Sequence, residues 1–253
     1  MCSTSLTVTG VNPHRSYRAP SSAGTMDGIH VAQGEDMTET VRHTTAVLFD
    51  VGGVLVTNRP DPTRVARILG LDGSAESVSL VDHSTWFHRD AYDAGCSDRE
   101  FWDSVAGDCG LGETSEETLA ALVAEDVSRS EDPDPAALQV ARELHARGLR
   151  LGILSNAPVA IARAIENRPW AVGLFESFTF SGPLGETKPE RAIYRRAVHD
   201  IGAPVEEILF IDDRTPNLRA ASLMGMATLQ WTTAPVARAA LEDLLDRTGA
   251  LAS

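Results

Sequence analysis

Residues 46–56 read AVLFDVGGVLV, which combines a short apolar run, one acidic residue and a glycine pair. The apolar run before Asp50 is unbroken, as is typical of a buried strand in a parallel sheet. Asp50 therefore stands at the carboxyl end of a predicted strand, on a turn that the glycine pair makes flexible. A carboxylate in this place suits a nucleophile or a metal ligand, but an ordinary strand-to-turn aspartate has the same local pattern.

More strands and helices follow along the chain. Further strands are predicted at residues 149–154, 177–180, 208–211 and 227–231. Helices are predicted at residues 135–147, 189–201, 216–224 and 235–246. This alternation predicts an α/β fold, a Rossmann-like parallel sheet core with helices on both faces. Ligands bind at the carboxyl ends of the strands in such sheets, and Ser155, Asp212 and Asp213 fall there as Asp50 does.

Residues 59–134 lack a strand pattern and are predicted to form helices inserted after the first strand. Capping-box patterns at residues 97–100 and 114–117 open two of these helices. The aromatic residues of the insertion are expected in its core: Trp86, Phe87, Tyr92, Phe101 and Trp102. Alternatively, the insertion is a lid over the site. The candidates for substrate contact are then His88, Arg89 and Tyr92.

The sequence predicts three segments. Residues 1–44 form a tail, residues 45–58 and 135–253 form the α/β core, and residues 59–134 form the helical insertion. Residues 1–25 contain no acidic residue and are rich in Ser, Thr, Gly and Pro, which favours a disordered tail. A transit peptide would need an amphipathic period that is absent here. Met37 is an alternative start, so the native protein need not contain residues 1–36.

The composition disfavours several classes of main partner. The net charge of −14 and the pI of about 4.8 argue against nucleic acid or an anionic membrane, because both select basic patches. The three cysteines show no metal-binding spacing, which favours free thiols in a reducing cytoplasm. No apolar stretch has the length of a membrane span. We therefore expect a cytoplasmic protein, as a monomer or homodimer.

Four motifs in order resemble the haloacid dehalogenase-like hydrolase superfamily, over roughly residues 45–244. They are residues 49–55, Ser155-Asn156, Gly185-Glu186-Thr187-Lys188-Pro189 and Phe210-Ile211-Asp212-Asp213. Each motif alone is weak, but four in this order are specific. The insertion matches the position of this superfamily's small helical cap, and its sequence is similar to caps of the phosphatase branch.

The resemblance implies an Mg²⁺-dependent phosphatase of small phosphorylated metabolites. Asp50 would attack phosphorus and form an aspartyl-phosphate, and the phosphoryl group would bind to Ser155, Asn156 and Lys188. The implied metal ligands are Asp50, the backbone carbonyl of Gly52, Asp212 and Asp213. Taken singly, these residues could be a capping serine, a surface lysine and a turn aspartate pair, but as an ordered set they strongly favour the site.

The chain departs from the family at Gly52. Most phosphatases of this superfamily have a second Asp there, which protonates the leaving alcohol and then activates water. Loss of such a group typically costs roughly 10²–10⁴-fold in rate. Three explanations stay open: a substrate with a good leaving group, a substitute acid such as His83 or His88, or a weak or inactive relative that binds a phospho-ligand or a protein.

A 2-haloacid dehalogenase is a further alternative, because it also uses an Asp nucleophile on this fold. Such an enzyme attacks carbon, needs no metal and lacks the acidic pair in the fourth motif. Without a cation, Asp212 and Asp213 would add uncompensated negative charge beside Asp50. The residues therefore favour a phosphatase.

Overall fold

The computed structural model describes residues 44–57 and 59–246, and the structural statements below refer to these residues. The side chains of residues 243–246 are not described either. The predicted N-terminal tail, residues 1–44, lies outside the described part of the chain except for Thr44.

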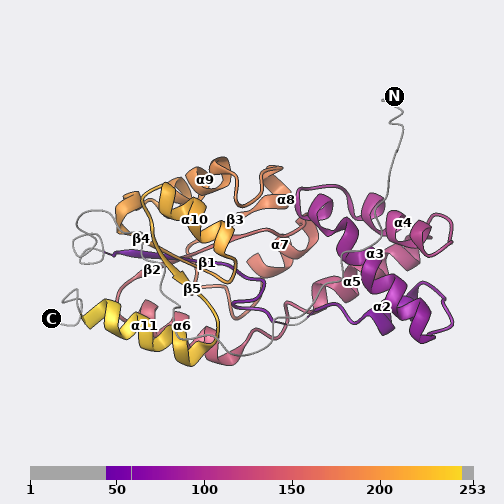
Figure 1. The fold of residues 1–253 in the computed structure, drawn as a ribbon, viewed down its shortest axis with the longest axis horizontal. Coiled ribbons are helices and arrows are strands. Elements are labelled where there is room, and N and C mark those ends of the chain that lie inside the picture. The colour runs from indigo at the N-terminus through magenta and orange to yellow at the C-terminus, as the bar shows by residue number, and fades with distance from the viewer. Residues whose placement is uncertain (1–43, 58, 247–253) are drawn as a thin grey trace, which may run out of the picture. The chain divides into compact units, whose positions relative to one another are not determined.

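The described residues contain one sheet of five parallel strands in the order β3-β2-β1-β4-β5 (Figure 1). The strands are β1 (Ala46–Phe49), β2 (Arg150–Ser155), β3 (Ser177–Phe180), β4 (Ile208–Asp212) and β5 (Ala227–Gln230). Each observed strand lies within one residue of its predicted bounds, so the predicted α/β fold with a parallel sheet is confirmed. Strand β1 is central, and its four residues are fully buried because helices cover both faces of the sheet.

Helices pack on both faces of the sheet (Figure 1). One face is covered by α6 (Pro135–Ala146), α7 (Val159–Glu166) and α11 (Ala234–Asp246). The other is covered by α9 (Arg191–Ile201) and α10 (Thr215–Leu223). Neighbouring residues of β1 alternate between the two cores, with Val47 in one and Leu48 in the other. The remaining short elements are α8 (Ser181–Leu184) and the 3₁₀ helix η1 (Val205–Glu207).

Four helices between β1 and α6 have a hydrophobic cluster of their own. They are α2 (Pro62–Ile68), α3 (Ala75–Asp93), α4 (Asp98–Asp108) and α5 (Glu116–Ser128). Tyr92 and Phe101 stack at the centre of this cluster, with ring centroids 4.0 Å apart, and Trp102 is fully buried beside them. Residues 59–134 contain no strand, as predicted. Their assignment to a separate cap domain stays a prediction.

Two predictions for these helices need correction. The capping box at Ser97 and Glu100 is present, but α5 is capped by Ser115, one residue later than the pattern at 114–117 predicts. Thr114 instead donates its hydroxyl to Asp103.

The second correction concerns the aromatic residues of α3. Trp86 and Phe87 are 37% and 71% exposed rather than part of the core. The buried face of α3 follows residues 81, 85, 89 and 92, and these two aromatics lie on the other faces of the helix.

The four-helix cluster is connected to the sheet by hydrogen bonds as well as by the chain. The backbone N–H of Asp134, where the chain returns from α5, donates to the carbonyl of Leu55 at 2.8 Å. The indole of Trp170 donates to the carbonyl of Ser130 at 2.9 Å. Among the helices described, none is both long and apolar enough to cross a membrane.

Candidate active site at the carboxyl edge of the sheet

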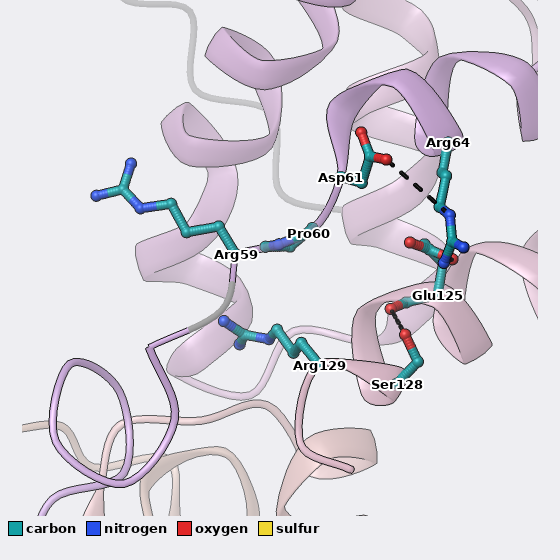
Figure 2. Close-up of a pocket in the computed structure, with 7 residues that line it drawn as sticks. All are labelled: Arg59, Pro60, Asp61, Arg64, Glu125, Ser128 and Arg129. Carbon is teal, nitrogen blue, oxygen red and sulfur yellow. Dashed lines mark hydrogen bonds and ion pairs between the residues drawn. The ribbon is translucent and has the colours of Figure 1, made fainter. Parts of the chain in front are cut away.

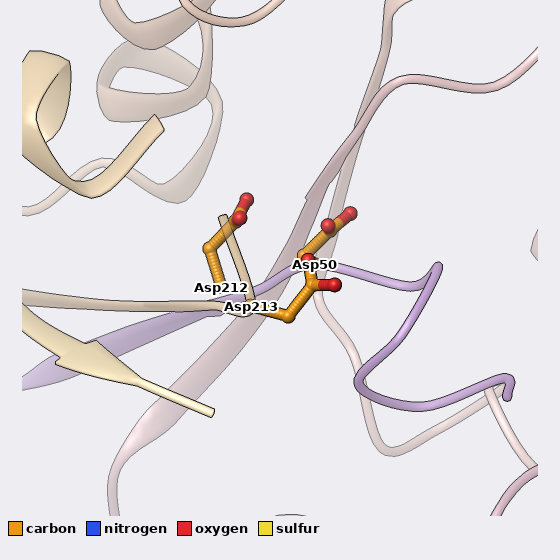
Figure 3. A group of neighbouring side chains, drawn as sticks. All are labelled: Asp50, Asp212 and Asp213. Atoms are coloured by element: carbon orange, nitrogen blue, oxygen red, sulfur yellow. The ribbon is translucent and has the colours of Figure 1, made fainter. Parts of the chain in front are cut away.

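Three neighbouring strands deliver polar side chains to one point. Phe49 is in register with Ile153 of β2 and Ile211 of β4, so the next residue, Asp50, is level with Leu154 and Asp212. The Asp50 backbone N–H continues this ladder by donating to the carbonyl of Ile211 at 2.9 Å. The carboxylates of Asp50, Asp212 and Asp213 gather here (Figure 3). The structure thus brings together the acidic residues that the sequence singled out.

Asp50 is nearly buried, and only one of its two carboxylate oxygens is used for hydrogen bonds. Oδ1 accepts from the Val51 backbone N–H at 2.7 Å and from the Ser155 hydroxyl at 2.7 Å, and it lies 2.9 Å from Lys188 Nζ. Within the described residues no hydrogen bond reaches Oδ2. Burial raises the pKa of Asp50 to about 6, and Asp212 adds to the rise against the opposing charge of Lys188.

Lys188 supplies the positive charge of the site. Its Nζ lies 2.7 Å from Asp212 Oδ2 and 2.9 Å from Asp50 Oδ1, and it donates to the Leu154 carbonyl at 3.0 Å. Burial opposes its charge, but Asp50 and Asp212 outweigh that effect and raise its pKa above the usual value. Lys188 is the only lysine in this sequence, since all the other basic residues among the 22 Lys and Arg are arginines.

Asn156 holds the backbone at Lys188. Its side-chain oxygen accepts from the Lys188 N–H at 2.8 Å, and its side-chain amide donates to the Lys188 carbonyl at 3.0 Å. The sequence predicted only a contact of Asn156 with the phosphoryl group, and these two hydrogen bonds, which clamp the Lys188 backbone, were not predicted. No spacing signal predicts them, because the two residues are 32 positions apart. The clamp fixes the loop that directs the lysine toward the carboxylates.

Asp212 is fully buried and held on several sides. The side-chain amide of Asn217 lies 3.0 Å from each of its oxygens, and the Arg214 backbone N–H donates to Oδ1 at 2.7 Å. The hydroxyl of Tyr194 donates to the Asn217 carbonyl at 2.9 Å and supports the start of α10. In the structure, Asn217 therefore supports the loop that carries Asp212. The contribution of Tyr194 was not predicted from the sequence.

Asp213 packs against the glycine turn and is the least satisfied of the acidic residues. Gly53 has a positive φ of 79°, and a Cβ there would collide with the Asp213 carboxylate, so the close approach requires glycine. Oδ1 of Asp213 is buried and has no hydrogen-bond partner among the described residues. Burial raises the pKa of Asp213, and the nearby Asp212 raises it further.

The arrangement fits a divalent cation with oxygen ligands. One ligand atom from each of Asp50, Asp212 and Asp213 lies within 4.8 Å of the others. Only Asp50 and Asp212 pair with the Lys188 ammonium, and three carboxylates against one positive charge leave excess negative charge in a poorly solvated place. The unpartnered oxygen of Asp213 is available for a further bond. Mg²⁺ is a hard cation that prefers such oxygen donors, so the residues present fit it.

Gly52 lies on the turn beside the three carboxylates, where it forms an isolated bridge with Val56. It is exposed, and a Cβ added to it would meet no heavy atom within 4 Å. The position therefore has room for a larger side chain. No steric requirement explains why this chain has glycine where most phosphatases of the family have aspartate.

The three candidate substrate contacts in α3 are engaged within the helices. His88 pairs with Asp108 at 2.9 Å. Arg89 is 5% exposed and pairs with Asp93 and with both oxygens of Asp126. The hydroxyl of the buried Tyr92 donates to Asp98 at 2.7 Å. Arg89 and Tyr92 therefore have structural roles inside the helical cluster, which was predicted for Tyr92 as a core aromatic but not for Arg89.

Comparison with known proteins gives a family match. A family model described as haloacid dehalogenase-like hydrolase matches residues 44–225. The sesquiterpene phosphatase astK of Aspergillus oryzae is 24% identical over 195 residues, which cover 74% of this chain and 89% of that protein.

Solved structures share the fold. A predicted HAD-like family hydrolase from Porphyromonas gingivalis superposes with a TM-score of 0.59 at 22% identity, covering 80% of this chain and 98% of that one. An HAD family enzyme from Bacteroides thetaiotaomicron, in complex with magnesium and inorganic phosphate, gives 0.56 at 22% identity, covering 74% and 94%. The L-2-haloacid dehalogenase of Xanthobacter autotrophicus gives 0.57 at 20% identity, covering 78% and 82%. The fold is thus shared by a dehalogenase and by an enzyme crystallised with magnesium and phosphate, so the fold alone does not assign the reaction of this chain.

Proposed function

This chain belongs to the haloacid dehalogenase-like hydrolase family, and from that premise we propose that it is an Mg²⁺-dependent phosphatase of small phosphorylated metabolites. The observation that carries the proposal is the cluster of three carboxylates at the strand ends, two of which pair with one buried lysine. Dehalogenation, which needs no metal, would leave this excess negative charge uncompensated beside the nucleophile. The phosphatase names among the relatives support the same choice.

The nucleophile in this proposal is Oδ2 of Asp50. The other oxygen is engaged by Val51, Ser155 and Lys188, so the carboxylate is held with Oδ2 free. Oδ2 attacks phosphorus, the bond from phosphorus to the ester oxygen breaks, and an aspartyl-phosphate forms on Asp50. Water then cleaves this intermediate, which releases inorganic phosphate and restores the carboxylate.

Ser155 and Lys188 stabilise the charge of the transferring phosphoryl group. Both side chains already contact Asp50, so they lie beside the reacting bond, and Ser155 turns its one hydroxyl proton from Asp50 Oδ1 to a phosphoryl oxygen. A bound Mg²⁺ would be held by Asp50, Asp212, Asp213 and the Gly52 carbonyl, and it would offset the negative charges of carboxylate and phosphate. Asn217 and Asn156 keep Asp212 and Lys188 in place.

The substrate class follows from Gly52. Since glycine supplies no proton, the ester oxygen must leave with little help, as from a sugar 1-phosphate or another ester with a good leaving group. The alternative function is a phospho-ligand or protein binding module with feeble turnover, and the next experiment distinguishes the two.

Phosphate release from a panel of phosphomonoesters is expected to depend on Mg²⁺. Chelation by EDTA should lower the rate by about 100-fold or more, because a metal ion contributes several kcal/mol of charge stabilisation. Added Mg²⁺ should restore the rate, and esters with good leaving groups should react fastest. Absence of turnover on every ester, including aryl phosphates, would favour the binding module.

Binding of Mg²⁺ can also be measured without turnover, from the unfolding temperature of the protein. At 100 times its Kd, a ligand that binds only the folded protein stabilises it by about 2.7 kcal/mol. Mg²⁺ should therefore raise the unfolding temperature of the native chain and raise that of Asp213→Asn less. An equal effect on both proteins would contradict the assigned ligand.

Gly52→Asp is expected to increase turnover of alkyl phosphates by up to about 100-fold, because it supplies the missing general acid. The space around Gly52 admits the new side chain, and its φ lies outside the range that demands glycine. Aryl phosphates should gain much less, since their leaving groups need no proton. The measurement is kcat/KM across esters whose leaving alcohols differ in pKa.

Gly52→Asn is the matched control for this variant. It has nearly the same size and shape but cannot act as an acid at neutral pH. It should leave the dependence of rate on leaving-group pKa unchanged. If Asn and Asp increased the rate equally, the gain would come from the geometry of the turn, and the explanation through a missing acid would be wrong.

A further inference from the structure

A cavity of about 310 Å³ lies between the segment leading into α2 and the end of α5 (Figure 2). Its lining includes three arginines, which are Arg59, Arg64 and Arg129. The chain as a whole is acidic, with a net charge of −14. A concentration of guanidinium groups around one hollow is therefore not a consequence of composition.

Arg64 is compensated within the cavity wall. It lies 4.0 Å from Asp61 and 3.5 Å from Glu125, which are the two acidic residues of the lining. Arg59 has no carboxylate within ion-pair distance among the described residues, and its guanidinium lies 5.1 Å above the Trp86 ring. The lining thus has three arginines and two carboxylates. Both carboxylates lie beside Arg64, so Arg59 and Arg129 have no acidic partner within the lining.

Arg129 is only 17% exposed and is poorly satisfied. Its Nε is buried and lies 3.3 Å from Asp126 Oδ1, an ion pair that forms no hydrogen bond in the described part of the chain. The nearest carboxylate, Asp126 at 3.3 Å, already accepts two bonds from Arg89. Burial lowers the pKa of Arg129, and repulsion from Arg89 lowers it further. Arg129 therefore shares its one paired carboxylate with Arg89, and an additional acceptor in the cavity would offset part of the cost of its burial.

We propose that this cavity binds an anionic group, phosphate-like or carboxylate, between Arg59 and Arg129. The planar guanidinium presents paired donors that match such groups bidentately. Figure 2 draws the Arg59 guanidinium turned away from Arg129, and it lies over the Trp86 ring, so binding by both arginines requires Arg59 to turn into the cavity. The site is distinct in its residues from the carboxylate cluster, which would bind the reacting phosphate.

The anion has two conceivable sources, a second acidic group on the substrate or a separate small anion. Arg59 follows Val56, the bridge partner of Gly52, by three residues, which span at most roughly 11 Å. This separation of Val56 and Arg59 is within the length of a small metabolite with two anionic groups. The substrate source rests on the proposed phosphatase function, whereas the site itself does not.

The test is sulfate binding to the metal-free full-length protein, measured by calorimetry at constant ionic strength. Without metal, the three carboxylates at the strand ends repel anions, so sulfate reports on the arginine cavity. Arg59→Met and Arg129→Met should each weaken sulfate binding by about tenfold. Arg196→Met, at an exposed arginine paired with Asp200, is the matched control and should bind as the native chain does. Undetectable sulfate binding, or equal affinity in all four proteins, would overturn the proposal.

Folding does not limit this test. Asp126 keeps its two bonds from Arg89 when Arg129 is replaced, and Arg59 has no ion pair to lose. If Arg129→Met nevertheless fails to fold, Arg59→Met decides the question.

The source of the anion is then read from kinetics. A roughly tenfold rise of KM in Arg59→Met for substrates with two phosphate groups, relative to substrates with one, assigns the anion to the substrate. Loss of sulfate binding with an unchanged ratio of KM values assigns it to a separate anion. Either result supports the cavity as an anion site. Because sulfate binding requires no turnover, failure of the phosphatase proposal would not be mistaken for failure of this one.

Discussion

Asp50→Asn is expected to lower the rate of phosphate release by on the order of 10⁴-fold or more, because the carboxylate is the nucleophile. The substitution keeps the shape of the side chain and an oxygen for the Val51 N–H and the Ser155 hydroxyl. Lys188 keeps its ion pair with Asp212 and its bond to the Leu154 carbonyl. The fold should therefore survive, and steady-state phosphate release on identical substrate panels measures the effect.

Two controls make this result specific to Asp50. Asp82→Asn makes the same aspartate-to-asparagine change at an exposed position of α3 and should leave the rate unaltered. Thermal unfolding of both variants shows whether the fold is intact. Turnover by Asp50→Asn within about tenfold of the native rate would exclude covalent catalysis through this residue, even if Mg²⁺ dependence were observed.

Lys188→Met is expected to damage both stability and rate. The variant leaves two buried carboxylates facing each other without their shared cation, which costs roughly 3–5 kcal/mol. For a domain of this size that corresponds to a fall of about 6–20 °C in Tm. The rate should fall by about 10³-fold, because a charge that stabilises the phosphoryl group is lost. Thermal unfolding in EDTA and phosphate release in Mg²⁺ measure the two effects.

A double variant tests the physical cause of this instability. Adding Asp50→Asn to Lys188→Met removes one of the opposed carboxylates, so it should recover part of the lost stability. Mg²⁺ should also reduce the loss, because it substitutes for the missing positive charge. If Lys188→Met cost less than about 1 kcal/mol in EDTA, the ion pairs at 2.7 and 2.9 Å would not carry the stability assigned to them.

The sheet and the gathering of acidic residues could be predicted because their signals are local. An apolar run followed by Asp50 or by Asp212 defines both the strand and its carboxyl end, and parallel strands bring such ends together. The α/β fold and the family were accessible for this reason. The roles of the individual residues in catalysis are proposals, and the variants described above test them.

Side-chain partners distant in sequence could not be predicted in the same way. Arg89 and Tyr92 have polar groups on a helix, and their partners are visible only in the folded cluster. Arg89 donates to Asp126, and Tyr92 donates to Asp98. The exposure of Trp86 and Phe87 could not be predicted either, because apolar character does not specify which face of a helix is buried. The arginine cavity combines residues from two segments about 65 positions apart, and no spacing predicts it.

The solitary lysine makes the proposed catalytic centre unusually easy to observe by spectroscopy. Protein grown with lysine carrying ¹³C at the ε position gives a single side-chain signal, and that signal comes from Lys188. No assignment is needed, because no second lysine exists in this sequence to overlap with it. Its chemical shift senses both Asp50 and Asp212, which are 2.9 and 2.7 Å away. One NMR line therefore follows cation loading, phosphate occupancy and every substitution at the carboxylates directly, in the intact chain.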